Sequence, residues 1–397
     1  MSSSLEGVRV LDFGRVIASA VCGTLLADMG AEVIKIERPG GEFDRNLGPF
    51  APDGRAIPYE LIVPRNKKSI TLNTRLSKGK EILDKLVQKA QIIITGFTPK
   101  GNQIMNLSYE RLKEINPAII QVAITGYGYE GPYANRPAFD SIAQAESGAM
   151  SFSGFPDNPP TRSNVPYVDF STSMLGALGA VSALRHQERT GLGQLVDVSL
   201  LRTASFMVAG MGTMAEYTLN NNVREPIGNN SFYTYADAFQ ARDGWVMINV
   251  IGNEIWQRFL KLIDRTEWLA DERFQNDYSR YTNRHMIAPV IQKWVSQYNL
   301  NEVVRLLNEN RIPCGRINTA REVVDDMVFK DSEMLIDMDY PGLGKVPMPG
   351  LPIRFSASPG EIKGNAPGLG EHNKEIYCEL LKYSQGEYEE LVGEGLL

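Results

Sequence analysis

The sequence is poor in the residues that mark several common classes of protein. Its 397 residues include three cysteines, Cys22, Cys314 and Cys378, which lie far apart and lack the short spacing of zinc ligands. The densest apolar stretch, Met174 to Leu184, falls well short of the ~20 residues that a membrane-spanning helix needs. The sequence therefore indicates neither a disulfide framework, nor a metal site, nor a membrane protein.

A large excess of basic charge is also lacking. The chain carries a net charge of −6 and has no long basic block, so nucleic acid is not an expected partner. The opening residues, MSSSLEGVRV, include no basic leader and no long apolar core, which favours a cytoplasmic location. With 43% hydrophobic and 22% charged residues, the chain is an ordinary globular one, long enough for about two or three domains of roughly 150 residues. We expect Cys22, in an apolar helical pattern, to be a core residue rather than a nucleophile.

The first forty residues have the pattern of a β-α-β unit. Val8–Asp12 and Glu32–Glu37 are predicted strands, and Ala18–Met29 is the helix between them. Such a unit implies a parallel strand pair with a right-handed crossover, and parallel sheets bind ligands at the carboxyl ends of their strands. The segments at those ends are Phe13–Ile17 and Arg38–Gly41.

Strands and helices continue to alternate after this unit. We expect strands over Ser69–Asn73, Ile92–Ile94 and Ile119–Ile124, and a helix over Lys78–Ala90. The loop Thr95–Gly101 then follows another strand at its carboxyl end. The pattern predicts an α/β fold with a doubly wound, mostly parallel sheet.

Basic side chains in two segments, one after a predicted strand and one just before the strand Ser69–Asn73, could bind an anionic ligand. A Gly-x-Gly-x-x-Gly turn is missing, so the usual nicotinamide dinucleotide fingerprint is absent. Arg38 could bind a phosphate on an adenosine ribose, or it could be a solvated surface arginine. Arg65, Lys67 and Lys68 could neutralise a polyphosphate, or they could form a solvated turn.

Eight segments in fixed order carry a family resemblance that covers essentially the whole chain. They are Gly7–Asp12, Gly30–Arg38, Arg65–Ser69, Gly126–Gly128, Asp169, Gly191–Val198, Asp243–Trp245 and Gly370–His372. With them, the sequence resembles the class III coenzyme A (CoA) transferases of the CaiB/BaiF type. These include the formyl-CoA:oxalate and carnitine CoA-transferases, and the α-methylacyl-CoA racemases are close relatives.

The resemblance implies a domain organisation. A large Rossmann-like domain would be formed by both chain ends, residues 1–200 and 321–397, with a smaller α/β domain inserted at 228–320. A linker at 201–227 would join them, and we expect one connecting helix over Ser199–Tyr217. The resemblance also implies that two subunits interlock as a homodimer.

The resemblance further implies an acyl-CoA:carboxylate CoA-transferase whose catalytic aspartate is Asp169. The chemistry suits a carboxylate, because attack on a thioester gives a mixed anhydride of comparable energy. Asp169 opens a helix of small side chains, where backbone N–H groups would favour its ionised form and stabilise an oxyanion. It could alternatively cap that helix. CoA, as part of the substrates, is the implied cofactor, with an acyl-CoA and a carboxylic acid as partners and no metal.

The family's CoA and substrate contacts map onto twelve residues of this chain. They are Arg15, Val16, Ile17, Ala18, Arg38, Leu72, Asn73, Gly96, Phe97, Lys100, Gly101 and Arg136. Gly96 and Ile104 stand where the family has an asparagine and an arginine, and Lys100 or Arg136 could supply the missing charge. Asp140 aligns with a glutamate that assists the formyl-CoA enzymes. It could position an acyl group or cap a helix over Ser141–Gly148.

Departures from the family pattern bear on the substrate. Ile17 replaces the glutamine of the formyl-CoA enzymes, and their glycine-rich flap has no counterpart between Ile227 and Val250. Because an apolar side chain cannot donate a hydrogen bond to a small dicarboxylate, these changes favour a carnitine-type or other larger acyl group over oxalate or formate.

Three alternatives remain open. A racemase needs an acid and a base on opposite faces of the α-carbon, but its histidine would fall at Phe139, and the histidines are His186, His285 and His372. Intramolecular CoA transfer would use the same Asp169. A CoA-binding protein without catalytic activity is the non-enzymatic alternative.

Overall fold

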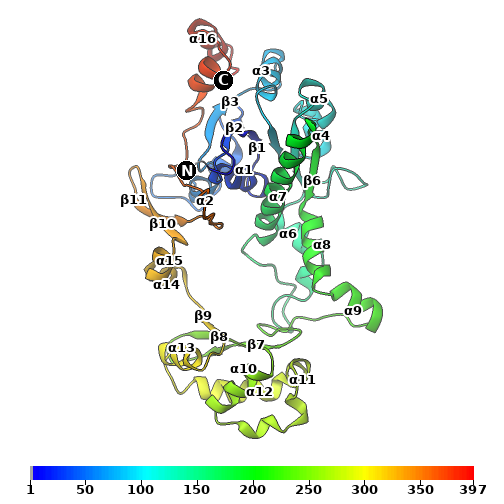
Figure 1. Ribbon diagram of the computed structural model, residues 1–397, viewed down its shortest axis with the longest axis vertical. Helices are drawn as coiled ribbons and strands as arrows, with labels where there is room; N and C mark the ends of the chain where they lie inside the picture. The colour runs from blue at the N-terminus through cyan, green and yellow to red at the C-terminus, as the bar shows by residue number, and fades with distance from the viewer. Residues whose placement is uncertain (1–2) are drawn as a thin grey trace. The chain divides into compact units, whose positions relative to one another are not determined.

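The computed structural model describes residues 3–397 (Figure 1). The described chain divides into two compact units. The first comprises the residues up to Ala149 together with Ser163–Asn221 and Met327–Leu397, and the second comprises Met150–Arg162 and Asn222–Asp326. Among the described residues, no helix has both the length and the apolar character needed to cross a membrane.

The first unit is built on a parallel sheet. Within residues 3–397 its six strands are β1 Arg9–Phe13, β2 Glu32–Glu37, β3 Lys68–Thr71, β4 Ile92–Thr95, β5 Ile120–Thr125 and β6 Leu195–Ser199. They pair in the order β3-β2-β1-β4-β5-β6, and every neighbouring pair is parallel. The predicted α/β fold with a mostly parallel sheet is confirmed. The strand order reverses between β1 and β4, which is where doubly wound sheets open a crevice for ligands.

Small residues let two helices pack closely on one face of this sheet. The helices α1 (Ala18–Asp28) and α7 (Tyr167–Thr190) share a core with the apolar residues of β1, β4 and β5. A Cβ at Gly176 of α7 would lie 2.9 Å from Ile124 Cδ1 and 3.1 Å from Cys22 Sγ. Cys22 is fully buried, so its prediction as a core residue is confirmed.

Shorter elements complete the first unit. They are a 3₁₀ turn at Phe43–Asn46, α2 Ile57–Ile62, α3 Ser77–Val87, α4 Pro99–Ile104, α5 Tyr109–Ile115, α6 Asp140–Glu146, α8 Leu200–Gly210, α9 Thr213–Asn220, α15 Met327–Asp331, β10 Leu335–Tyr340, β11 Gly344–Pro349, a π-helix at Glu375–Leu380 and α16 Gln385–Gly393. The amphipathic α3 buries Ile82, Leu83 and Leu86 in a second core on the sheet.

The C-terminal segment covers the edge strand β3. The Ser69 N–H donates to His372 Nδ1 at 3.2 Å, and the His372 N–H returns a bond to the Ser69 carbonyl at 2.9 Å. Asn373 Oδ1 accepts from the Thr71 N–H at 2.9 Å. An edge strand otherwise exposes unpaired backbone groups, so this docking explains why a segment 300 residues away in sequence belongs to the same unit.

The predicted helix over Ser199–Tyr217 is wrong in one respect, because the chain forms two helices there. α8 ends at Gly210, and Gly212 has a φ of +75° before α9 begins. This left-handed backbone conformation is easy for glycine and breaks a helix.

The second unit has its own core. An antiparallel sheet of β7 (Tyr235–Gln240), β8 (Trp245–Val250) and β9 (Cys314–Arg316) packs with aromatic residues that include Trp256, Phe259 and Phe274. Its helices are α10 Asn253–Leu262, α11 Asp277–Thr282, α12 Arg284–Val295, α13 Leu300–Glu309 and α14 Ala320–Asp325, with 3₁₀ turns at Thr266–Leu269 and Glu272–Phe274.

Candidate active site

A cavity of about 350 Å³ lies where β1, β4 and β5 end. Its walls come from the loop after each of these strands and from α7. Among its lining residues are seven of the sequence-predicted CoA contacts near these ends and the predicted nucleophile: Arg15, Val16, Ile17, Ala18, Gly96, Phe97, Gly101 and Asp169. The cavity is thus at the reversal of strand order.

Asp169 is a buried residue that lines this cavity. The residue lies in the first turn of α7, and 8% of its surface is exposed. The N-cap position of α7 is Pro166, so Asp169 is not the helix cap. Burial, followed by the negative charge of Asp140, raises the pKa of Asp169 from 3.8 to about 7.

The expectation that the helix start favours an ionised Asp169 is wrong. The N–H groups of Val168 and Asp169 both donate to Asp140 Oδ2, at 2.9 and 3.1 Å. These donors are already satisfied by another carboxylate, so they neither stabilise the Asp169 anion nor point at an oxyanion. The result is a carboxyl group whose charged and neutral forms are both accessible near neutral pH.

Asp140 caps α7 instead of its own helix. The helix α6 begins at Asp140, and its N-cap residue Phe139 makes no side-chain capping bond. Asp140 is buried, and its Oδ1 accepts from Gln144 Nε2. It does not line the cavity, so the structure puts its carboxylate behind Asp169.

Buried polar groups hold the loop between β1 and α1 in place. Asp12 Oδ1 accepts from the Gly14 N–H at 2.7 Å, and Asp12 is itself paired with Lys67 Nζ at 2.7 Å. Lys35 Nζ donates to the Gly14 carbonyl at 2.9 Å. The sequence analysis gave no role to Asp12 and Lys35, although charged side chains inside apolar strands are a signal that they need buried partners.

Ser173 links this loop to α7. Its hydroxyl is within hydrogen-bond distance of two carbonyls, Ala18 at 2.7 Å and Asp169 at 2.8 Å. The hydroxyl therefore sits between a predicted CoA contact and the predicted nucleophile. The sequence analysis gave no role to Ser173.

A second cavity, of about 240 Å³, adjoins the first at two residues. It is lined by the predicted contacts Arg38, Leu72 and Asn73, and by Arg75, which the sequence analysis missed. Arg15 and Phe97 line both cavities. The Arg15 guanidinium lies 4.8 Å from the centre of the Phe97 ring and 3.0 Å from Glu42 Oε2. The predicted CoA contacts thus fall into two groups, one in each cavity, and the Arg15–Phe97 pair lines both cavities.

Two remaining predicted residues have different surroundings. Lys100 lines neither cavity, and its backbone N–H donates to Asn135 Oδ1 at 2.9 Å. Arg136 does line the first cavity. Its guanidinium lies 5.0 and 4.6 Å from the rings of Tyr127 and Tyr133 and 3.4 Å from Glu146.

The prediction that the basic run forms a solvated turn is wrong, because its cations pair with carboxylates of the protein. Arg65 pairs with Asp28 at 2.5 Å, and both side chains are buried. Lys67 pairs with Asp12, and Lys68 lies 2.6 Å from both Glu32 and Glu375. Each cation neutralises a carboxylate of the protein, and none lines either cavity.

No histidine lines either cavity in the part of the chain that the structure describes. Phe139, where a racemase histidine would fall, lines the first cavity and is 65% exposed. Within residues 3–397, no three His, Cys, Asp or Glu side chains are grouped to hold a metal ion.

Comparison with known proteins agrees with this architecture. Residues 5–373 match the model of CoA-transferase family III, so the chain belongs to that family. It is 34% identical over 385 residues to a succinyl-CoA–D-citramalate CoA-transferase of Chloroflexus aurantiacus, with 95% of this chain and 94% of the relative covered. A formyl-CoA:oxalate CoA-transferase of Streptomyces coelicolor is 31% identical, with both chains fully covered. The crystal structure of a CaiB/BaiF family protein from Brucella suis superposes with a TM-score of 0.83 at 31% identity, covering 96% of this chain and 100% of that one.

Proposed function

We propose that this protein is a CoA-transferase that moves CoA from an acyl-CoA to a carboxylic acid through a mixed anhydride on Asp169. The observation that carries the proposal is the position of Asp169 in the cavity at the β1/β4 reversal. Membership of CoA-transferase family III and the names of the relatives support the reaction class.

The reaction consists of four acyl transfers. A carboxylate oxygen of Asp169 attacks the thioester carbonyl, the C–S bond breaks, and the CoA thiolate leaves. The thiolate then attacks the aspartyl carbonyl of the anhydride, which releases the donor acid and gives an aspartyl-CoA thioester. The acceptor carboxylate attacks this thioester to form a second anhydride, and the thiolate attacks its acyl carbonyl. The products are the new acyl-CoA and a free Asp169 carboxylate.

The surroundings of Asp169 suit both halves of this cycle. A pKa of about 7 leaves a substantial fraction of the carboxylate ionised at neutral pH and makes that anion a stronger nucleophile than a solvated aspartate. Apolar residues, among them Ile17, Ile124 and Leu200, line the cavity that holds Asp169. Exclusion of water protects the anhydride and the aspartyl thioester from hydrolysis.

The two cavities suggest how the CoA molecule lies. We propose that the nucleotide end occupies the cavity lined by Arg38, Asn73 and Arg75, and that the thioester reaches Asp169 in the other cavity. The pantetheine arm would then cross the Arg15–Phe97 pair. Guanidinium groups are well suited to bind phosphates, and two of them line the nucleotide side.

The family resemblance also leads us to propose a homodimer. The outer side of α7 exposes Met174 by 52% and Leu178 by 62%, and exposed apolar patches mark interaction surfaces. Sedimentation equilibrium tests this point: a mass of one chain at micromolar concentration contradicts it.

A racemase is the less supported alternative, because Phe139 cannot carry a proton. Incubation of an α-methylacyl-CoA in deuterated water without an acceptor acid distinguishes the two. A transferase leaves the α-proton in place, whereas a racemase exchanges it. Intramolecular CoA transfer remains compatible with the same residues, and a screen of donor and acceptor acids decides between the two forms of transfer.

Chemical trapping tests the proposed nucleophile. Succinyl-CoA, acetyl-CoA and formyl-CoA are the first donors to screen, since the two named relatives use different donors. Treatment of the protein with a reactive donor and then hydroxylamine or borohydride should modify Asp169. Asp169→Ala should abolish transfer while CoA still binds, and retained turnover in this variant rejects the proposal.

A further inference from the structure

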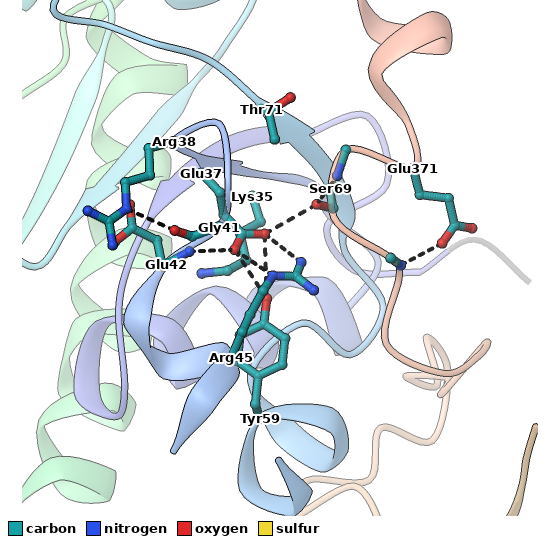
Figure 2. Close-up of polar contacts among 12 residues, drawn as sticks. Lys35, Glu37, Arg38, Gly41, Glu42, Arg45, Tyr59, Ser69, Thr71 and Glu371 are labelled. Atoms are coloured by element: carbon teal, nitrogen blue, oxygen red, sulfur yellow. Dashed lines mark hydrogen bonds and ion pairs between the residues drawn. The ribbon is translucent and has the colours of Figure 1, made fainter. Parts of the chain in front are cut away.

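The carboxylate of Glu37 is the centre of a buried polar cluster beside the second cavity (Figure 2). Glu37 ends β2, and its side chain is fully buried. Arg45 binds both carboxylate oxygens, with Nε 2.8 Å from Oε1 and Nη2 2.7 Å from Oε2. The Ser69 hydroxyl lies 3.2 Å from Oε2, and the Tyr59 hydroxyl lies 3.5 Å from each oxygen.

The cluster requires an ionised acceptor. Arg45, Ser69, Tyr59 and the Glu42 N–H all present donors to the two oxygens of Glu37. Burial opposes ionisation, but the bonds from Arg45 and the charge of Lys35 outweigh it, so the pKa of Glu37 is lowered. An amide in place of the carboxylate would turn an NH₂ group toward one of these donors.

Glu37 is connected to both ends of the turn that carries Arg38. Arg38 follows Glu37 directly, and the Glu42 N–H lies 3.5 Å from Glu37 Oε1. Within the turn, Arg38 Nε donates to the Gly41 carbonyl at 2.8 Å, and the Gly41 N–H donates to the Arg38 carbonyl at 2.9 Å. Gly40 and Gly41 have φ values of +88° and +82°, which a glycine adopts without strain.

This arrangement leaves one edge of the Arg38 guanidinium for a ligand. Its Nε is used inside the turn, whereas no residue within 3–397 accepts from its two terminal nitrogens. Arg38 is exposed and lines the second cavity. Two parallel N–H donors on a guanidinium match the oxygens of a phosphate.

We propose that Glu37 is a positioning residue: it fixes the turn that presents Arg38 to the phosphate on the ribose of CoA. The carboxylate of Glu37 is fully buried and both of its oxygens are occupied within the protein, so it would act through Arg38 rather than on the ligand. The inference rests on the proposed function, since it requires CoA in the second cavity. It extends that function by assigning part of the selectivity for a phosphorylated ribose to a residue whose carboxylate is occupied within the protein.

Two ligands that differ only in that phosphate test the inference. We would measure the dissociation constants of CoA and 3′-dephospho-CoA by calorimetry on the full-length protein. In Glu37→Gln, the affinity for CoA should fall about tenfold or more, because the Arg38 fork loses its orientation. The affinity for dephospho-CoA should change by less than about threefold, so the ratio between the two ligands should collapse.

Matched variants separate positioning from general damage. Tyr59→Phe removes only the two 3.5 Å contacts and should keep the ratio of the parent protein. Arg45→Lys keeps the positive charge but loses the paired hydrogen bonds to Glu37, so the ratio of the two dissociation constants should be intermediate. If Glu37→Gln does not fold, Arg45→Lys provides the test. Arg38→Gln by itself should remove the selectivity for CoA over 3′-dephospho-CoA. Adding Glu37→Gln to that variant should lower the selectivity no further.

The contrary outcomes are distinct. Equal weakening of both ligands in Glu37→Gln, or an unchanged ratio, overturns the positioning role while the proposed transferase stands. An unchanged ratio in Arg38→Gln places the phosphate elsewhere and also overturns it. If the parent protein binds neither ligand, the proposed function fails and the inference fails with it.

Discussion

Replacing Asp169 by asparagine should stabilise the folded protein, and more strongly at higher pH. The pKa of Asp169 is raised from 3.8 to about 7 by burial and by Asp140. Folding therefore favours the neutral carboxyl: its contribution to stability is fully present below pH 3.8 and is lost as the pH rises through 7. At one pKa unit per 1.36 kcal/mol, the ionised carboxylate costs about 4 kcal/mol at pH 8 and about 1.5 to 2 kcal/mol at pH 5.

The observable is the pH dependence of the difference between Asp169→Asn and the parent protein. That difference in the free energy of unfolding should grow by roughly 2 to 3 kcal/mol in favour of the variant between pH 5 and pH 8. A constant intrinsic effect of the asparagine cancels in this comparison.

Urea unfolding followed by far-ultraviolet circular dichroism is the suitable assay. All four tryptophans lie in the second unit, so their fluorescence does not report on α7. Asp53→Asn is the control, because a hydrogen bond from Arg55 lowers the pKa of that exposed carboxyl. Its difference from the parent should not grow in favour of the variant. A pH-independent difference for Asp169→Asn, or one that grows toward low pH, refutes the reasoning.

Three further predictions follow from the site. The ratio kcat/KM should rise about tenfold per pH unit below a midpoint near 7, because the nucleophile must be ionised; a flat profile between pH 5 and 8 contradicts this. Asp140→Asn removes the negative charge next to Asp169 and should move the midpoint of the kcat/KM profile to lower pH. The partly lost cap of α7 should lower the free energy of unfolding in urea by about 1 kcal/mol. Ser173→Ala removes the hydroxyl that donates to the Ala18 carbonyl and should lower the free energy of unfolding by about 1 to 2 kcal/mol. It should also raise KM for the acyl-CoA more than it lowers kcat. An unchanged KM in a folded Ser173→Ala protein counts against its role in positioning the loop.

Local sequence patterns were enough to predict the sheet and the loops that surround the site. Alternation of apolar strands and helices predicted the parallel sheet, and the rule that ligands bind at strand ends drew attention to Arg15–Ile17 and to Gly96 and Phe97. The structure brings these residues together around one cavity. They are predictable because each lies within a few residues of a strand whose end is visible in the sequence.

Long-range pairing was not predictable from the same patterns. Lys68 pairs with Glu375, which lies 307 positions along the chain, and nothing in a run of cations indicates where its partners are. Asp140 caps a helix that begins 27 residues after it, although its position next to α6 favoured a cap for that helix. These contacts depend on how the layers stack, and one sequence without its relatives carries no signal of that geometry.

The central claim is that Asp169 forms the covalent intermediate, and transfer of oxygen tests it most directly. During turnover with an acceptor acid whose carboxylate carries ¹⁸O, each cycle should leave one oxygen of the acceptor in the aspartate. Mass spectrometry of the peptide that contains Asp169 should then show exchange of ¹⁶O for ¹⁸O at that residue. Turnover that leaves Asp169 unlabelled, or that places the label in another side chain, contradicts the account.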